Sequence, residues 1–106
     1  MNRGDIYWVD LNPTRGSETN KTRPCVIVSA SPINKARNTV IVVPLSTAAR
    51  ARPPIVINVE CLGKQVTAIC DQIRTVDKNR LTQSAGILSA KDMNLLENSL
   101  RQILTL

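Results

Sequence analysis

Histidine and phenylalanine are both absent from this chain of 106 residues. Histidine is the commonest metal ligand and the commonest general base in proteins, so any catalytic chemistry here must use Arg, Glu, Asp, Ser or Thr. Tyr7 and Trp8 are the only aromatic side chains. A platform of stacked aromatic residues for nucleic-acid bases is therefore not expected, and bases would have to be held by Arg side chains and hydrogen-bonding loops.

The chain also has few cysteines and no long apolar run. Cys25, Cys61 and Cys70 are odd in number and form no C-x-x-C pair, so neither a disulfide framework nor a thiolate zinc site is expected. No segment approaches the roughly 18 apolar residues of a membrane helix, and no signal-peptide pattern is present. We therefore expect a soluble, cytoplasmic protein without a membrane partner, whose cysteines are small buried apolar residues.

The composition is that of an ordinary globular domain, with 42% hydrophobic and 21% charged residues. The length is sufficient for one domain with a modest core and too short for two ordinary domains. We expect a single domain over residues 1–106.

The net charge of +6 is concentrated in one part of the sequence. Residues 13–54 hold seven Lys or Arg against Glu18 alone, which accounts for a charge of +6, whereas residues 1–12 carry −1 and residues 55–106 carry +1. A clustered basic segment with a pI near 9.8 is typical of polyanion binding, although a solvated face that only confers solubility has the same composition.

Short runs rich in Val and Ile, separated by turn residues, predict strands. The candidate strands are residues 5–10, 25–30, 39–45, 55–59, 66–70 and 73–76. Residues 12–22 contain no apolar residue except Pro13 and predict a long exposed loop, of a kind that often carries function. Ser31 before Pro32 predicts an N-cap and a short helix over residues 33–37.

The end of the chain predicts an amphipathic helix. Ser89 and Asp92 have the spacing of a capping box, and Met93, Leu96, Leu100 and Ile103 then recur at helical spacing. This apolar stripe must pack on the sheet or on a second copy of the chain. Six short strands and one terminal helix predict a mainly β fold, a small, strongly bent sheet or SH3-like barrel with a C-terminal helix.

Three groups of residues carry candidate chemistry. Arg23 follows the polar loop and opens a strand, a place from which a rigid guanidinium could bind phosphate in bidentate fashion; with Glu18 it could equally form only a surface ion pair. Ser46 and Thr47 end a strand and could be an ordinary turn. A third polar group, which could serve only to specify the fold, comprises Asp71, Gln72 and Arg74.

RNA cleavage is a reaction for which such a set, without histidine or metal, is adequate. The 2′-hydroxyl of RNA is the nucleophile, so a protein needs only to align it, move two protons and stabilise charge on the phosphoryl oxygens. The products would be a 2′,3′-cyclic phosphate and a 5′-hydroxyl, and DNA would not be cut.

Several motifs resemble the MazF/PemK toxins of toxin–antitoxin modules. They are RGDIYWVDLNP at residues 3–13, GSE at 16–18, TRP at 22–24, VPLST at 43–47 and DQIRTVDKNRL at 71–81, and the match runs in order through the chain. The resemblance implies the SH3-like barrel of the CcdB/MazF/PemK type in a homodimer. It also implies a metal-independent, cofactor-free, sequence-specific endoribonuclease that cleaves single-stranded mRNA and stops translation and growth. A MazE/PemI-like antitoxin would inhibit it by laying a disordered tail along the dimer groove.

The resemblance also implies roles for individual residues. Arg23 corresponds to the family's catalytic arginine, Ser46 or Thr47 to its catalytic hydroxyl, and Glu18 to the loop glutamate that binds substrate and helps in proton transfer. Asp71 and Gln72 correspond to residues that contact bases. We assign the remaining RNA contacts to the same surface, through Asn12, Pro13, Arg15, Gly16, Ser17, Thr19, Lys21 and Arg74.

Two positions depart from the PemK pattern. Some PemK-type members carry histidine where this chain has Ser17 and arginine where it has Ile69. Their acid–base scheme does not transfer, so Asp71 is assigned RNA binding and a catalytic role for it stays open.

Two other functions fit the same fold class. One is a non-enzymatic toxin similar to the CcdB gyrase poisons, which use their terminal helix to bind the target; here that helix ends without an aromatic residue. The other is a basic nucleic-acid-binding module without activity, whose affinity would fall with salt while no bond is broken.

Overall fold

A computed structural model describes residues 1–13, 15–18 and 21–106 of the chain. The described elements are β1 (Asp5–Asp10), β2 (Thr22–Ile27), α1 (Ser31–Ala36), β3 (Thr39–Ser46), β4 (Val56–Cys61), β5 (Lys64–Ile69), the 3-10 turn η1 (Cys70–Gln72), β6 (Arg74–Asp77), the 3-10 turn η2 (Lys78–Arg80), β7 (Leu81–Ile87) and α2 (Ala90–Leu104).

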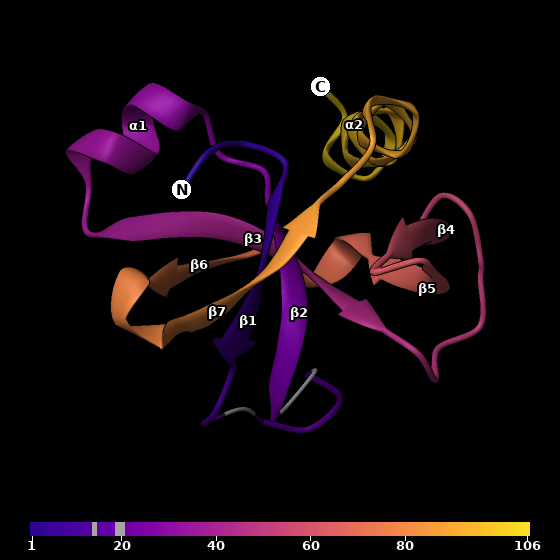
Figure 1. Cartoon of the computed structure of the whole chain (residues 1–106). Helices are drawn as coiled ribbons and strands as arrows, with labels where there is room; N and C mark the ends of the chain where they lie inside the picture. The colour runs from indigo at the N-terminus through magenta and orange to yellow at the C-terminus, as the bar shows by residue number, and fades with distance from the viewer. Residues whose placement is uncertain (14, 19–20) are drawn as a thin grey trace.

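Within this described part of the chain, seven strands form one antiparallel sheet in the order β4-β5-β3-β2-β1-β7, and β6 pairs with β3. The sheet curls into a half-barrel, so that its two end strands approach each other (Figure 1). The thiol of Cys61 on β4 contacts the carbonyl of Ala85 on β7 at 3.9 Å. The expected mainly β fold with a C-terminal helix is confirmed.

Strand β3 lies at the centre of the sheet and changes partners along its length. One edge pairs with β2, and the other pairs first with β6 and then with β5. Pro44 lies between the last pair with β6, at Val42, and the first pair with β5, at Leu45. Proline has no backbone N–H, so it is tolerated at such an interruption of the hydrogen-bonded ladder.

Side chains of the central strands alternate between two apolar clusters, as strand geometry requires. On β2, Val26 belongs to the cluster that packs against helix α2, whereas Cys25 and Ile27 belong to a second cluster with β1 and β6. Tyr7 and Trp8 pack against these clusters, one against each. Both aromatic residues therefore serve the core.

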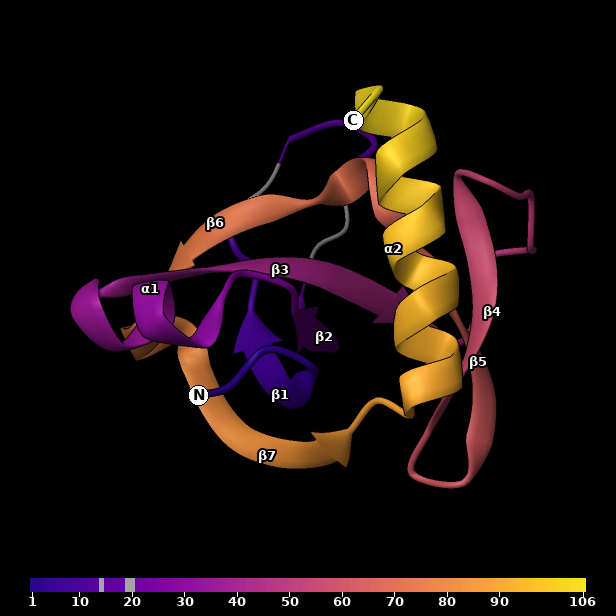
Figure 2. The ribbon, with the colours of Figure 1, turned by 90° about the horizontal axis from the view of Figure 1, so that it is seen from above.

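Helix α2 confirms the predicted stripe. Leu96 and Leu100 are buried, and Met93 and Ile103 are half-buried against the same cluster. The helix lies across the curled sheet beside β4 and β5 (Figure 2). The stripe thus packs on the sheet of its own chain.

The N-terminus of α2 differs in part from the capping box. The Ser89 hydroxyl accepts a hydrogen bond from the Asp92 N–H at 3.1 Å, as predicted. In a complete capping box the Asp92 carboxylate would also accept from the N–H of Ser89. Here it accepts from the N–H of Glu60 at 2.8 Å instead. Because β4 is an edge strand, this contact satisfies one of its donors and joins the helix to the sheet.

Several predicted boundaries were wrong. Helix α1 begins at Ser31 itself, and the Ser31 hydroxyl accepts from the N–H of Arg3 at 3.0 Å instead of capping the helix. Strand β2 begins at Thr22, three residues before its predicted start, because its first residues pair with β1. Cys70 lies in η1 and not in a strand. Strand β7 was not predicted at all, and its residues are held extended by pairing with β1.

Among the described residues, no helix is long and apolar enough to cross a membrane.

The buried thiols generate a test of the fold. Burial raises the pKa of Cys25 to about 12, although the nearby positive charges of Arg74 and Arg23 oppose the rise. At pH 8 a thiol of this pKa is about 10⁻⁴ ionised, against about 10⁻¹ for an ordinary thiol of pKa 9.0. We expect Cys25 to react with a thiol reagent at pH 8 about 10³-fold more slowly in the folded protein than in guanidinium chloride, where all three cysteines should react. Equal labelling rates in the two states would contradict this packing.

Candidate functional site

A polar pocket of about 370 Å³ lies where the loop after β1 meets the turn η1. It brings together Glu18, Asp71, Gln72 and Arg74, which come from two segments more than 50 residues apart in the chain. Its remaining lining residues are Leu11, Pro44 and Ile73. The sequence did not single out these three residues, because an apolar residue gives the same signal whether it lines a pocket or a core.

The turn η1 carries two of the polar side chains into this pocket. It follows β5 directly, and it places Asp71 on the surface with Gln72 half-buried beside it. The amide Nε2 of Gln72 donates to the carbonyl of Ser17 at 3.4 Å, which joins the turn to the loop. The carboxylate of Glu18 accepts the N–H of Arg15 at 2.6 Å. One oxygen of Glu18 is thereby held by the loop backbone.

Arg23 lies near this pocket without lining it. It is half-buried at the start of β2, where it pairs with Val9 of β1. Arg23 and Cys25 are two residues apart on one strand, so their side chains share a face of the sheet. The positive charges of Arg74 and Arg23 both act on the Cys25 thiol and lower its pKa, against the larger rise that burial causes.

Arg23 and Ser46 occupy equivalent places on two diverging strands. The pairs between β2 and β3 end at Cys25 and Pro44, and Figure 1 shows the strands separating beyond them. Arg23 comes two residues beyond the last pair on β2, and Ser46 comes two residues beyond it on β3. The separating strand ends therefore carry a guanidinium on one side and a hydroxyl on the other.

The Ser46 hydroxyl is buried and already engaged. Its oxygen accepts hydrogen bonds from the N–H groups of Ala48 and Ala49, both at 3.1 Å. A serine hydroxyl has two acceptor positions and one donor. Both acceptor positions are occupied, so the O–H is the one hydrogen-bonding function that Ser46 can still offer to a ligand. Thr47, by contrast, is exposed.

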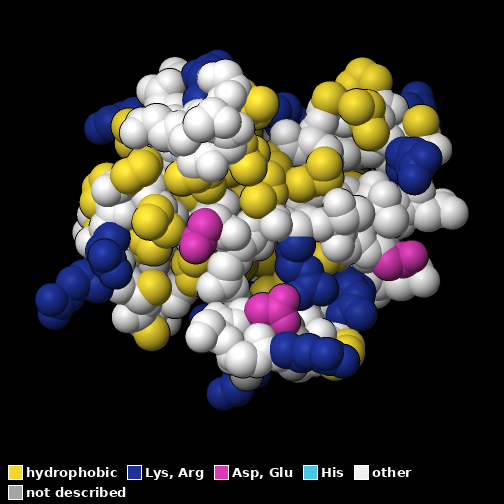
Figure 3. All heavy atoms as spheres, turned by 180° about the vertical axis from the view of Figure 1, so that it is seen from behind, with side chains coloured by type: hydrophobic (Ala, Val, Ile, Leu, Met, Phe, Trp, Pro, Cys, Tyr) yellow, Lys and Arg dark blue, Asp and Glu magenta, His cyan; other side chains and the backbone are white. Residues whose placement is uncertain are grey.

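The other predicted RNA-binding residues lie in the loop between β1 and β2. Pro13, Arg15, Gly16, Ser17 and Lys21 are exposed, and Thr19 lies outside the described residues. Asn12 is also exposed, but its side-chain oxygen accepts the N–H of Lys21 at 3.1 Å and so closes the base of the loop. Figure 3 shows basic side chains gathered around acidic ones in the lower part of the molecule, where this loop lies in Figure 1.

Arg80 is a residue of this region that the sequence reasoning missed. Its guanidinium donates to the backbone carbonyl of Asp10 at 3.0 Å and to that of Asn12. Arg80 was included in the sequence analysis only within the motif at residues 71–81. The turn η2 that carries it is capped by Asp77, whose side chain accepts the N–H of Asn79 at 2.9 Å. A local sequence pattern cannot predict a contact between residues about 70 positions apart.

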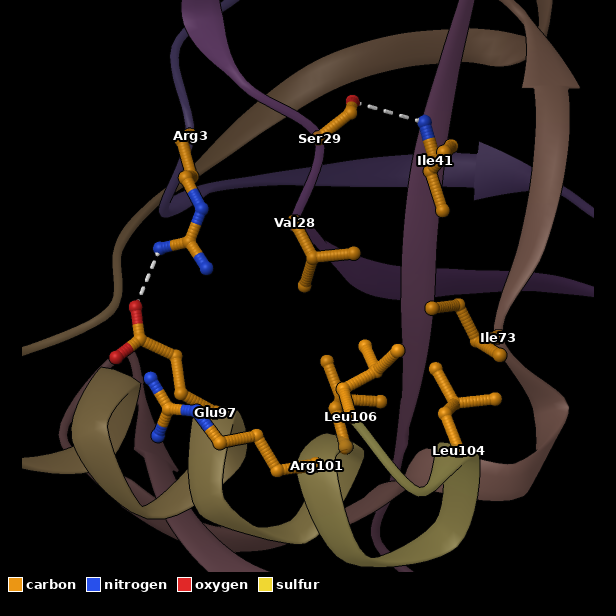
Figure 4. A pocket seen from close by; sticks show the side chains of 10 residues that line it. Arg3, Val28, Ser29, Ile41, Ile73, Glu97, Arg101, Leu104 and Leu106 are labelled. Carbon is orange, nitrogen blue, oxygen red and sulfur yellow. Dashed lines mark hydrogen bonds and ion pairs between the residues drawn. The ribbon is translucent and has the colours of Figure 1, made fainter.

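A second pocket, of about 310 Å³, is mainly apolar and adjoins the first through Ile73, which lines both. It lies between the C-terminal part of α2 and the central strands, and Figure 4 shows Val28, Ile41, Leu104 and Leu106 around it. An ion pair between Arg3 and Glu97, at 2.8 Å, lies at its edge. Leu106 is 85% exposed and Ile41 is 38% exposed, so the pocket presents apolar surface to solvent.

Among the described residues, no group of three or more His, Cys, Asp or Glu side chains is arranged to hold a metal ion.

The curled antiparallel sheet with its terminal helix is a fold that this chain shares with solved MazF toxins. The crystal structure of MazF from Deinococcus radiodurans superposes with a TM-score of 0.89 at 19% identity, covering 100% of this chain and 97% of that one. Residues 2–104 match the family described as the PemK-like, MazF-like toxin of type II toxin–antitoxin systems, and the chain belongs to that family.

Individual relatives agree with this assignment. The chain is 38% identical over 105 residues to the endoribonuclease MazF of Staphylococcus saprophyticus, covering 94% of this chain and 88% of that protein. It also resembles a mycobacterial endoribonuclease solved in complex with its cognate antitoxin, with a TM-score of 0.84 and 25% identity over 100% of this chain and 96% of that one.

The geometry separates the two candidate hydroxyls by their effect on stability. Replacing Ser46 by Ala leaves the N–H groups of Ala48 and Ala49 without their acceptor, so we expect the free energy of unfolding to fall by about 1–2 kcal/mol. Replacing the exposed Thr47 by Ala should change it by less than about 0.5 kcal/mol. Denaturant unfolding of both variants measures the difference, and equal effects would contradict a structural role for the Ser46 oxygen.

Proposed function

We propose that residues 1–106 form one toxin domain that cleaves single-stranded mRNA without a metal ion, by attack of the ribose 2′-hydroxyl on the adjacent phosphate. The products carry 2′,3′-cyclic phosphate and 5′-hydroxyl ends, and loss of mRNA in the cytoplasm stops translation and growth. The family membership and the endoribonuclease relatives support the RNA substrate. The observation that carries the proposal is the placement of Arg23 and Ser46 on the two diverging strand ends.

In this proposal the scissile phosphate lies between β2 and β3. The guanidinium of Arg23 has five N–H donors in a fixed fork that matches the geometry of a phosphate group. Negative charge grows on the phosphoryl oxygens as the 2′-oxygen attacks, and Arg23 stabilises that charge. Ser46 donates its remaining O–H to the same phosphate, because its acceptor positions are occupied by backbone N–H groups. The exposed Thr47 is the second candidate for this role.

Glu18 and the turn η1 hold the nucleotides beside the scissile bond. One carboxylate oxygen of Glu18 is fixed by the N–H of Arg15, which leaves the other free to contact substrate and to assist proton transfer. Asp71 and Gln72 supply acceptors and donors suited to the edges of a base in the polar pocket. The exposed loop residues and Arg74 supply the remaining contacts to RNA.

We propose two protein partners. A second copy of the chain covers the apolar pocket around Ile41 and Leu106, and because Ile73 lines both pockets, pairing here would join the two polar pockets along one groove. A cognate antitoxin binds that groove and excludes RNA. The mycobacterial relative solved with its antitoxin supports this second partner.

The nuclease proposal is tested by replacing Arg23. In buffer containing a chelator, the wild-type protein should cleave a long single-stranded RNA and leave cyclic phosphate ends, which mass spectrometry of the fragments detects. Arg23→Ala should lower the cleavage rate on the order of 10²-fold or more, because one charge-stabilising group is lost. Arg37→Ala is the matched control, since it removes an equal charge from an exposed position beside α1, away from the loop. Intact RNA with the wild-type protein, or equal rates for the two variants, would refute the proposal.

The dimer proposal is tested by placing a charge in the apolar pocket. Light scattering at micromolar concentration should give about twice the chain mass of 11.6 kDa for the wild-type protein. Ile41→Lys should shift the mass toward the monomer, because a buried unpaired ammonium is costly to an interface. Ile33→Lys, at an isoleucine on α1 that is 57% exposed and does not line this pocket, should leave the dimer intact. A monomeric wild-type protein would overturn this pairing.

A further inference from the structure

Three successive backbone carbonyls at the exit of β1 are bound by arginine side chains. Arg80 donates from Nη1 to the carbonyl oxygens of Asp10, at 3.0 Å, and Asn12. Arg74 donates from Nη1 to the carbonyl of Leu11, which lies between them, at 3.3 Å. Backbone carbonyls just beyond the end of a strand have no hydrogen-bond partner in the sheet. These guanidinium groups donate the hydrogen bonds that a neighbouring strand would otherwise supply.

The sheet register explains why Arg80 can make this contact. Leu81, the first residue of β7, pairs with Val9 of β1. Arg80 immediately precedes Leu81 and Asp10 immediately follows Val9, so antiparallel pairing brings them to the same place. The turn η2 then directs the half-buried Arg80 side chain along the exit of β1.

The same short segment closes the base of the loop. The N–H of Leu11 donates to the carbonyl of Lys21 at 3.1 Å, and the N–H of Lys21 donates to the side chain of Asn12 at 3.1 Å. The strand that carries Arg23 starts at the residue after Lys21. The arginine contacts therefore hold the segment that joins the loop carrying Glu18 to the start of β2.

We infer that Arg80 is a positioning residue for cleavage. By holding the carbonyls of Asp10 and Asn12, it fixes the base of the loop and, through Lys21, the places of Glu18 and Arg23. This inference rests on the proposed nuclease function. It assigns Arg80 an effect on kcat, the rate at which bound substrate reacts. Displacing catalytic groups by about 1 Å lowers such a rate by as much as 10²-fold.

The alternative for a basic residue beside an RNA site is a phosphate contact. An Arg80 that acted only by charge would strengthen RNA binding, and its loss would raise KM and weaken the salt dependence of binding. The two roles therefore differ in which kinetic parameter changes.

The test compares Arg80→Met, Arg80→Lys and Lys78→Met. Methionine is close to arginine in length but has no donor, and lysine keeps the charge without the fork that reaches two carbonyls. Lys78→Met is the matched control, because it removes one positive charge from the same turn η2 at a residue that lines a separate pocket with Pro32 and Lys35. The substrate is a short RNA containing one mapped cleavage site, and kcat and KM are measured for each variant.

Arg80→Met should lower kcat about tenfold or more with KM changed less than about threefold, and Arg80→Lys should fall between it and the wild type. Lys78→Met should keep the wild-type kcat. A rise in KM at unchanged kcat for Arg80→Met, or a wild-type kcat for Arg80→Lys, would overturn the inference. Should Arg80→Met fail to fold, Arg80→Lys alone decides the question by the same criterion.

Limited trypsin digestion gives a readout that does not depend on nuclease activity. Arg15 and Lys21 are exposed in the loop, so release of its base should speed cutting at these two residues in Arg80→Met and not in Lys78→Met. Unchanged cutting in Arg80→Met would overturn the inference even if RNA cleavage were slowed. Faster cutting by trypsin together with a wild-type protein that leaves RNA intact would refute the nuclease function and leave the structural role of Arg80 standing.

Discussion

The antiparallel pairing of β2 with β3 is the constraint on which the rest of the structure depends. It sets which side chains of the two strands enter each apolar cluster, with Val26 and Val43 on one side and Cys25 and Val42 on the other. The pairing ends at Cys25 and Pro44, where the strands diverge; Arg23 precedes Cys25 by two residues, and Ser46 follows Pro44 by two. The core and the candidate site are thus two consequences of a single register.

Some of the arginine side chains hold the fold together. The guanidinium groups of Arg74 and Arg80 bind carbonyls at the exit of β1, and that of Arg3 pairs with Glu97 on α2. Arg23 lies at the start of β2, beside the polar pocket, where a guanidinium can be held rigidly and still meet a ligand.

Local patterns predicted the elements whose causes are local. The short apolar run within residues 5–10 gave the bounds of β1, and the Ser89 cap gave the start of α2. Strand β7 was missed because Ala85 is its one fully buried side chain and its extended form comes from β1. Resemblance and composition brought Glu18, Asp71, Gln72 and Arg74 to one site, and the structure places them in one pocket. The contacts of Arg80 and Asp92 could not be predicted, since each bonds backbone groups far away in the sequence.

The central claim is that Arg23 and Ser46, at the strand ends, align and stabilise a phosphate that is attacked by the 2′-hydroxyl of its own ribose. Removing that one 2′-oxygen from the substrate tests the claim most directly. An RNA with one mapped cleavage site is compared with the same RNA carrying deoxyribose only at the nucleotide 5′ to the scissile bond. The account predicts that this bond stays intact while the modified RNA still competes for the protein with similar affinity. Cleavage of the modified bond at a rate near that of the unmodified RNA would contradict it.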